Sequence, residues 1–543
     1  MKASNPILRG FHPDPSIIRV GDDYYIATST FEWWPGVRIH HSKDLVHWEF
    51  LTYPLTRVSQ LDMAGVRASR GIWAPCLTYD QGTFFLVYTV VESWRCNMYD
   101  TNNYLVTAPD IMGPWSEPVS LNNFGFDPSM FHDDDGRKYM VSVVTDHRVP
   151  KKYTGRLVVQ EYSMEEKKMV GPTREVYAAK DIFLEGPHIF KKDGWYYLFT
   201  ADTGTGEGHG QTIQRAQSVF GPYEMYQPPC GIRTEKTEAY SILTSRHNPE
   251  LPIQKAGHAD LVQTQNGDWY MVHLCGRPLR IQDAETGEEI RRYPLGRETA
   301  IQKIYWTKEG WPELANHTVL PDSETEVAGL PAHPWPEKPA RDEFDSPVLD
   351  PEFQSLRVPL DETYLSLQER PGYLRMYGRS GLASCFHQSL VARRWTEFRF
   401  DAATSVEFEP TVFKQMAGLI LFYDTEDYYY LHISRDEDVG KCLLLLTANR
   451  KEYRYPMDPV PLKEGMPVHL KVSVSGTQVR FFYGYSETAM EAVGPVLDAS
   501  LLSDETCSDG AFTGSMVGIC CQDLTGFRLA ADFDYFEYRA ETP

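Results

Sequence analysis

Residues 12–26 read HPDPSIIRVGDDYYI, and this stretch shows how the first part of the chain is organised. An acid between two prolines stands at the entrance to a short apolar strand, an acidic Gly-Asp turn follows, and a second strand rich in aromatic residues comes next. The same order of features returns at residues 74–86, 127–140, 185–198 and 258–271. Five copies of one strand–turn–strand unit, spaced roughly 50 to 75 residues apart, are typical of a radial or stacked repeat. The repeats therefore predict an all-β chain that begins with a five-bladed β-propeller over residues 1–317.

The residue that opens each repeat is the first candidate for function. In a propeller the innermost strand of every blade begins at the central channel, so side chains at one repeat position converge on the axis. The residues at that position are Asp14, Ala74, Asp127, Glu185 and His258. Three carboxyl groups and an imidazole are costly to remove from water unless they have a use. The pattern therefore predicts a functional site on the axis.

Three converging carboxyl groups suit the hydrolysis of a glycosidic bond. That reaction needs one protonated carboxyl to donate to the leaving oxygen and one carboxyl that is ionised. A third carboxylate nearby raises the pKa of the acid by like-charge repulsion and keeps it protonated near neutral pH. The lone glutamate, Glu185, has the longest reach of the three and is the natural proton donor.

Composition and charge narrow the class of protein. The formal net charge is −22, which argues against nucleic acid or an anionic membrane as a partner and leaves a neutral ligand easy to accommodate. Aromatic residues make up 13% of the chain, which suits β-blades and sugar-binding surfaces. The nine cysteines are an odd number without metal-type spacing, and no apolar run indicates a signal peptide or a membrane span. We expect a cytoplasmic protein with reduced thiols.

The second half of the chain follows a different pattern. A proline-rich stretch, LPAHPWPEKP at residues 330–339, reads as a stiff connector, and we place a linker at residues 318–340. Successive short strands and no helix of useful length follow it. Residues 341–543 are therefore expected to form a β-sandwich of the concanavalin A-like or lectin-like kind.

The loops between repeats supply further candidates. Phe31, Trp33 and Trp34 stand beside a Pro-Gly turn, either as a hydrophobic plug between blades or as a wall that stacks on a sugar, with Phe31 the best placed for the second role. Trp73 directly precedes the inner strand of the second repeat, a position that favours ligand stacking at the channel mouth. Residues 204–210 are glycine-rich but lack the Lys-Ser/Thr of a phosphate-binding loop, so we expect a rim loop.

Several of these motifs resemble a known family. They are Asn5–Ile7, His12–Ser16, Arg70–Pro75, Phe126–Ser129, Glu185–His188, Gly257–Asp260, Gly296–Thr299, Phe512–Gly514 and Gly518–Asp523. Together they resemble the β-xylosidases of glycoside hydrolase family 43, in the subgroup with a C-terminal β-sandwich. The match spans nearly the whole chain.

The resemblance implies a role for each matching position. Asp14 would be the general base that activates water, Glu185 the general acid, and Asp127 the residue that tunes the pKa of Glu185 and holds it in place. The residues that would bind substrate are Phe31, Trp73, His258, Arg297 and Phe512. Family 43 enzymes invert, so the base and acid carboxyls should lie about 6.5 to 9.5 Å apart. Phe512, on a loop of the sandwich, would close the channel mouth into a dead-end pocket, which fits exo action.

The resemblance also sets the expected substrate and partners. We expect an exo-acting, inverting β-1,4-xylosidase that acts on xylo-oligosaccharides and has some α-L-arabinofuranosidase activity, without a required cofactor. A calcium ion near His258 is allowed by the family pattern, although a lone histidine is usually structural. Relatives are often dimers or tetramers, so a homo-oligomer is expected. Three alternatives stay open: an enzyme mainly for arabinofuranosides, a non-catalytic sugar-binding propeller, and a retaining relative.

Overall fold

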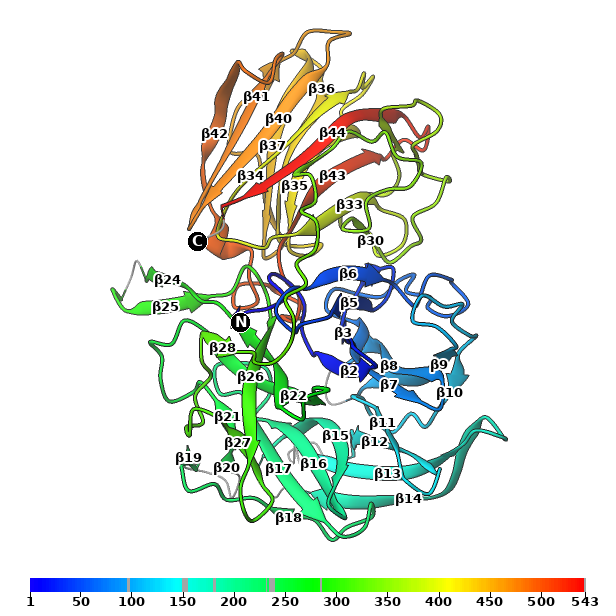
Figure 1. Cartoon of the computed structure of the whole chain (residues 1–543). Coiled ribbons are helices and arrows are strands. Elements are labelled where there is room, and N and C mark those ends of the chain that lie inside the picture. Colours follow the sequence, from blue (N-terminus) through cyan, green and yellow to red (C-terminus); the bar gives the residue numbers. More distant parts are fainter. Residues whose placement is uncertain are drawn as a thin grey trace.

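The computed structural model describes residues 1–94, 98–148, 155–178, 182–230, 232–233, 240–283 and 286–541. This part of the chain is built almost entirely of β-strands, in two domains stacked one above the other (Figure 1). None of its helices is long and apolar enough to cross a membrane.

The first domain is a propeller of five antiparallel sheets, which confirms the predicted blade number (Figure 1). The first blade contains β2 (Ser16–Val20), β3 (Asp23–Thr28), β5 (Arg38–Ser42) and β6 (Glu49–Thr52). The second contains β7 (Gly71–Asp80), β8 (Thr83–Ser93), β9 (Asp100–Ala108) and β10 (Val119–Ser120). The third contains β11 (Ser129–His132), β12 (Lys138–Val144), β13 (Arg156–Ser163) and β14 (Lys168–Ala178).

The last two blades complete the ring. The fourth contains β15 (Leu184–Lys192), β16 (Trp195–Asp202), β17 (Gly210–Ala216) and β18 (Glu224–Met225), with β21 (Leu243–Thr244) paired to β17. The fifth contains β22 (Gln254–Gln263), β23 (Trp269–Gly276), β26 (Glu298–Trp306) and β27 (Pro312–Leu314). The innermost strands β2, β7, β11, β15 and β22 are the apolar strands of the five sequence repeats. Short hairpins lie outside the blades, at β19 (Ile232–Arg233) with β20 (Tyr240–Ser241), and β24 (Leu279–Gln282) with β25 (Glu289–Arg292).

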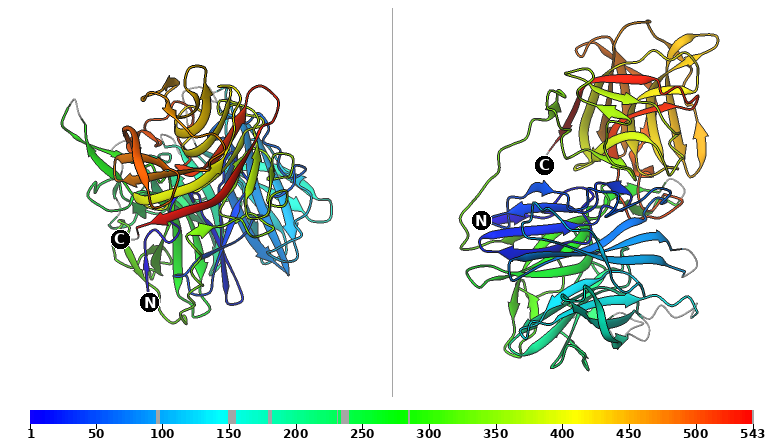
Figure 2. Two further views of the ribbon diagram at one scale, coloured as in Figure 1. Left: turned by 90° about the horizontal axis from the view of Figure 1, so that it is seen from above. Right: turned by 90° about the vertical axis from the view of Figure 1, so that its right-hand side faces the viewer.

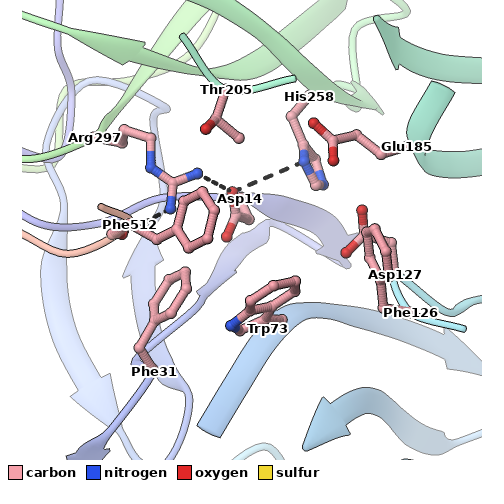
Figure 3. Close-up of a pocket in the computed structure, with 10 residues that line it drawn as sticks. All are labelled: Asp14, Phe31, Trp73, Phe126, Asp127, Glu185, Thr205, His258, Arg297 and Phe512. Atoms are coloured by element: carbon pink, nitrogen blue, oxygen red, sulfur yellow. Dashed lines mark hydrogen bonds and ion pairs between the residues drawn. The ribbon is translucent and has the colours of Figure 1, made fainter. Parts of the chain in front are cut away.

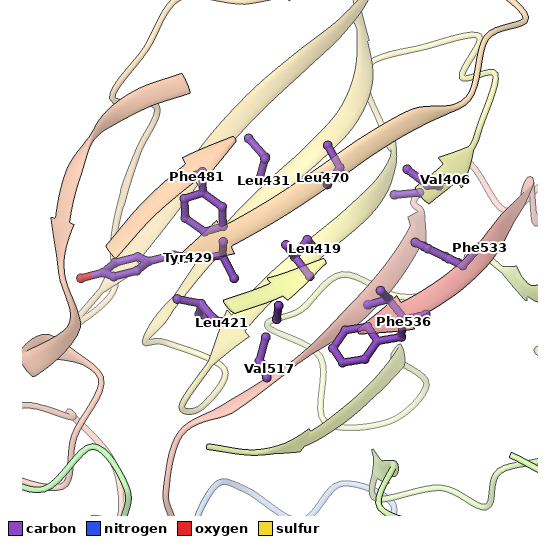
Figure 4. Packing of buried hydrophobic residues seen from close by; sticks show 14 of the residues in the cluster. Val406, Leu419, Leu421, Tyr429, Leu431, Leu470, Phe481, Val517, Phe533 and Phe536 are labelled. Carbon is purple, nitrogen blue, oxygen red and sulfur yellow. The ribbon is translucent and has the colours of Figure 1, made fainter. Parts of the chain in front are cut away.

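The second domain is the expected β-sandwich. Its outer sheet contains β31 (Leu365–Ser366), β32 (Leu374–Tyr377), β44 (Ala530–Ala540), β34 (Arg399–Glu407), β40 (Val468–Ser475), β41 (Gln478–Gly484) and β42 (Met490–Asp498), with β29 (Arg341–Asp342) paired to β44. The facing sheet contains β38 (Glu452–Arg454), β37 (Gly440–Asn449), β36 (Tyr428–Asp436), β35 (Gln415–Phe422), β43 (Met516–Asp523), β33 (Ser389–Arg394) and β30 (Gln354–Leu356), with β39 (Val460–Pro461) paired to β37. Side chains such as Leu419, Leu431 and Phe481 fill the space between the sheets (Figure 4).

Strand pairing ties the two domains together more closely than the sequence suggests. β4 (Trp33–Trp34) leaves the first blade and pairs with β30 of the sandwich, with Trp34 opposite Ser355 and Trp33 opposite Leu356. Trp33 and Trp34 are fully buried there, so they form no sugar-stacking wall. Trp34 packs in one cluster with residues of the first two blades, such as Ala27 and Ile72, as a plug between blades would, whereas Trp33 packs against Phe422 of the sandwich. The sequence does not reveal this because two residues are too few to show a strand pattern.

The connecting segment also differs from the predicted linker of residues 318–340. β28 (Glu324–Glu326) pairs with the N-terminal strand β1 (Lys2–Ser4), so the start of that stretch belongs to the propeller. The proline-rich part runs along the outside of the molecule (Figure 2). Eight of the nine cysteines are free, and Cys96 lies outside the described residues.

The contact between Trp33 and Phe422 gives a test of how strongly the domains are coupled. Their rings pack edge to face at 5.8 Å across the domain interface. We expect Trp33→Ala and Phe422→Ala each to lower the free energy of unfolding by about 3–5 kcal/mol, because each leaves a large cavity. Urea denaturation of both single variants and the double variant should give a combined loss smaller than the sum, since the two rings share one contact.

A matched double variant serves as the control. Leu470 is buried in the sandwich core and belongs to a different cluster from Trp33. Trp33→Ala and Leu470→Ala should therefore add to within about 0.5 kcal/mol. Strict additivity for the Trp33 and Phe422 pair as well would contradict an energetic coupling between the domains.

Candidate active site

At one repeat position, at or just before the axial part of each innermost strand, the residue has left-handed backbone. The φ angles are 54° at Asp14, 33° at Ala74, 51° at Asp127, 54° at Gly186 and 50° at His258. This region is uncommon for residues other than glycine, and each such residue costs about 1–3 kcal/mol unless the surroundings hold it. In β7, β15 and β22 the ladder also shifts register at this point. Five blades therefore make the same strained turn at the axis.

This geometry corrects the alignment of the fourth repeat. Gly186, not Glu185, is the left-handed residue of that blade. A Cβ on Gly186 would lie 2.9 Å from ring atoms of His258, so only glycine fits. Glu185 therefore stands one residue earlier in the repeat than Asp14 and Asp127. The sequence alignment failed because it matched carboxyl groups rather than backbone conformations.

The side chains at these two repeat positions line one pocket with an empty volume of about 350 Å³ (Figure 3). Its lining residues are Asp14, Phe31, Trp73, Phe126, Asp127, Glu185, Thr205, His258, Arg297 and Phe512. All eight residues proposed from the sequence are among them. Phe126 and Thr205 were missed. Phe126 precedes Asp127 as Trp73 precedes Ala74, so the repeat alignment already held the signal for it, whereas Thr205 lies on the glycine-rich rim loop.

Asp14 is held by polar contacts on both carboxyl oxygens. The Ser29 hydroxyl donates to Oδ2 at 2.7 Å, and Arg297 Nη1 donates to Oδ1 at 3.3 Å. Ser29 is itself fixed, because its hydroxyl accepts a hydrogen bond of 2.8 Å from the Ala74 amide. These two donors hold the Asp14 carboxyl group in one orientation.

Glu185 and Asp127 experience a different environment. Burial, followed by the charge of Asp14, raises the pKa of Glu185 to about 7, although Arg297 opposes the shift. Its Oε1 atom has no hydrogen-bond partner among the described residues. Burial and the charges of Glu185 and Asp14 also raise the pKa of Asp127, but the Gly186 amide donates to its Oδ2 at 2.8 Å and favours the ionised form. Glu185 and Asp127 together therefore hold a proton near neutral pH.

His258 lies against this group without serving as a charged partner. Its Nδ1 is 3.8 Å from Oδ1 of Asp14, and burial lowers its pKa to about 4, so the ring is neutral at pH 7. Calcium takes six to eight oxygen ligands. Within the described ranges, no three His, Cys, Asp or Glu side chains are arranged to hold a metal ion. The calcium ion near His258 stays a prediction, and no step of the proposed reaction uses it.

The aromatic rings of Phe31, Trp73 and Phe512 lie together on one side of the pocket (Figure 3). The ring of Phe512 stacks on Phe31 with centroids 6.2 Å apart and packs edge to face on Trp73 at 5.4 Å. Arg297 Nη2 donates to the Phe512 carbonyl at 2.7 Å while Nη1 contacts Asp14. One guanidinium thus links the sandwich loop to the carboxyl group at the centre of the pocket.

Comparisons with known proteins agree with this architecture. Residues 3–312 match the family model described as Glycosyl hydrolases family 43, and residues 341–539 match the model described as Beta xylosidase C-terminal Concanavalin A-like domain. The Xylan 1,3-beta-xylosidase of Vibrio sp is 43% identical, with 98% of each chain covered. Xylosidase/arabinosidase 43B of Humicola insolens is also 43% identical, with 98% of this chain and 97% of the relative covered. The crystal structure of a xylan beta-1,4-xylosidase from Bacillus Halodurans C-125 is 48% identical, with a TM-score of 0.94 and coverage of 99% of this chain and 100% of that one.

The charges around Glu185 give a test with opposite signs. Asp14→Asn should lower the pKa of Glu185 below 7, because it removes a nearby negative charge, and Arg297→Gln should raise it, because it removes a positive one. The measurement is a ¹³C NMR titration of protein labelled at the glutamate side-chain carboxyls. The Glu185→Gln spectrum assigns the signal. A pKa that stays the same in both variants would show that burial alone sets it.

Proposed function

The chain belongs to glycosyl hydrolase family 43, and we propose that it is an exo-acting β-xylosidase. It removes D-xylose from the non-reducing end of β-1,4-xylo-oligosaccharides with inversion, and it has α-L-arabinofuranosidase side activity. Relatives named as xylosidases over nearly their whole length support the substrate class. The observation that carries the proposal is the pocket in which Asp14 accepts hydrogen bonds from Ser29 and Arg297 while burial raises the pKa of Glu185 to about 7.

In the proposed reaction, Asp14 acts as general base. A water molecule beside Asp14 attacks the anomeric carbon and gives up its proton to the Asp14 carboxylate. The contacts from Ser29 and Arg297 support this role, because they orient the carboxylate. Neutral His258 adds no positive charge that would weaken the base.

Glu185 acts as general acid in the same step. As the bond between the anomeric carbon and the leaving oxygen breaks, the Glu185 carboxyl gives its proton to that oxygen. We place the shared proton of the pair on Glu185 rather than on Asp127, because the Gly186 amide stabilises the Asp127 carboxylate. Asp127 then keeps Glu185 protonated by repulsion and fixes the turn on which it stands.

The remaining lining residues bind the sugar. Phe31, Trp73 and Phe512 offer apolar faces to the ring, and Arg297 and His258 offer donors to its hydroxyl groups. The ring of Phe512 covers Phe31 and Trp73 at one side of the pocket, and a pocket closed on one side supports exo action. An arabinofuranosyl unit presents similar hydroxyl groups, which supports the side activity.

The proposal also covers the glycosidic linkage that is cleaved and the cellular compartment of the enzyme. One relative is named for β-1,3 bonds and another for β-1,4 bonds, and we favour β-1,4 from the overall resemblance. The eight free cysteines support a reducing, cytoplasmic setting. The expected homo-oligomer stays a prediction.

Proton NMR of fresh hydrolysis tests the substrate and the stereochemistry together. With β-1,4-xylobiose we expect α-xylose to appear first, before mutarotation, because direct attack by water inverts the anomeric carbon. Parallel runs with β-1,3-xylobiose and an aryl α-L-arabinofuranoside rank the linkage and the side activity. Early β-xylose would make Asp14 a nucleophile, and the absence of turnover with all three substrates would leave sugar binding alone.

Glu185→Gln separates acid catalysis from binding. We expect kcat/KM on xylobiose to fall about 100- to 10,000-fold, because the leaving oxygen is no longer protonated. An aryl xyloside with an acidic phenol should lose less than about tenfold, since its leaving group needs little protonation. Equal losses on both substrates would contradict the assignment.

The pH profile provides the control for the same variant. A general acid must be protonated, so wild-type kcat/KM should be retained below the pKa of about 7 and fall as the pH rises through it. The Glu185→Gln variant should lack this fall with the activated substrate.

A further inference from the structure

The pocket depends on a loop that comes from the other domain. Residues 503–515, here called the roof loop, join the sandwich strands β42 and β43 and descend to the propeller (Figure 1). One end of the loop is tied by Glu505, which accepts hydrogen bonds from Lys255 Nζ at 2.8 Å and from the Tyr293 amide at 3.0 Å. These contacts lie seven residues before Phe512, so they do not by themselves orient its ring.

Asp509 forms a second contact between the roof loop and the propeller, closer in sequence to Phe512 than Glu505 is. Its Oδ1 lies 3.1 Å from Arg70 Nη2, and its Oδ2 lies 2.7 Å from Arg67 Nε. The Asp509 and Arg70 side chains are 9% and 2% exposed, whereas Arg67 is 48% exposed. The guanidinium of Arg70 also lies over the Trp94 ring, 5.3 Å from its centroid, and that ring is 5.5 Å from Phe512. Removing one partner of such a buried pair leaves an uncompensated charge.

The residues between Asp509 and Phe512 fit tightly on the propeller. Gly510 has a φ of 114°, and a Cβ there would lie 2.4 Å from the Ser69 side chain. Two residues later the Phe512 amide donates to the Ser69 hydroxyl at 3.2 Å. The Ser69 carbonyl in turn accepts a hydrogen bond of 3.1 Å from Trp73 Nε1. The segment that Asp509 fixes thus sets Phe512 in register with Trp73.

We propose that Asp509 is a positioning residue for hydrolysis, whose ion pair with Arg70 holds Phe512 against the sugar pocket. The inference rests on the proposed function but concerns a residue outside the pocket. The Phe512 ring contacts the sugar in the bound state and the transition state alike. Its misplacement therefore removes uniform binding, which raises KM and leaves kcat nearly unchanged.

The test compares steady-state kinetics of full-length variants on β-1,4-xylobiose. Asp509→Asn should raise KM about tenfold with kcat within about twofold of wild type, because only a fraction of molecules hold the closed roof loop. Asp509→Glu keeps the charge and should recover most of the affinity. Gly510→Ala leaves Asp509 intact but pushes the loop away from Ser69, so it should raise KM in the same way. The thermal midpoint of each variant is measured alongside.

Glu487→Gln provides the matched control. Glu487 also pairs with an arginine, Arg341, but both lie on the sandwich and outside the pocket lining. Its KM should match that of wild type.

The outcomes separate this inference from the proposed function. A wild-type enzyme without turnover of any xyloside or arabinofuranoside would overturn the proposed function itself. An active wild type with unchanged KM in Asp509→Asn and Gly510→Ala would overturn the positioning role alone. A fall in kcat without a rise in KM would also overturn it, because the ion pair would then act on the carboxyl groups rather than on Phe512.

Discussion

The structure depends on one backbone constraint, the left-handed residue at or just before the axial part of each innermost strand. An ordinary strand alternates its side chains across the two faces of a sheet and would not aim two neighbouring residues at the axis. The turn at Asp14, Asp127 and His258 breaks that alternation and brings their side chains to one point. The backbone cost is of the order of 1–3 kcal/mol at each position, and the packed blades around it supply the compensation. The only blade with glycine at this position is the one in which the His258 ring takes up the space.

The same turn separates the acids by environment. Asp14 receives a hydroxyl and a guanidinium hydrogen bond, whereas Glu185 is buried with an oxygen that has no partner in the described part of the chain. Burial without donors raises the pKa of Glu185. One pocket therefore gives two carboxyl groups different surroundings, and the difference comes from neighbours rather than from residue type. Asp127 experiences opposing effects, because burial and the charges of Glu185 and Asp14 raise its pKa while the hydrogen bond from the Gly186 amide lowers it.

The sequence predicted much of this arrangement, and its failures have physical causes. The repeats, the turn signals and the convergent acids predicted the propeller and the axial residues that share a pocket, because blade geometry follows from local pattern. Phe512 was predicted only from the resemblance to family 43. Glu185 was aligned with Asp14 although Gly186 is its equivalent, since backbone conformation is not visible in residue type. Thr205 was missed because a glycine-rich loop carries no periodicity. The pairing of β4 with β30 joins residues more than 300 positions apart, and no local signal reports it.

The segment around Phe31 shows why the two domains form one catalytic unit. Phe31 lines the pocket, and Trp33 and Trp34, two and three residues later, form a strand of the sandwich sheet. Glu32, between Phe31 and Trp33, is fully buried. It accepts a hydrogen bond of 2.9 Å from the amide of Ser69, whose hydroxyl group accepts a hydrogen bond from the roof loop. Docking of the sandwich on the propeller therefore fixes the positions of both Phe31 and Phe512. A separate binding module would need only a linker and a surface contact, whereas here the pocket wall and the domain interface are made from the same few residues. A change that disrupts the domain interface should consequently also change the shape of the sugar pocket.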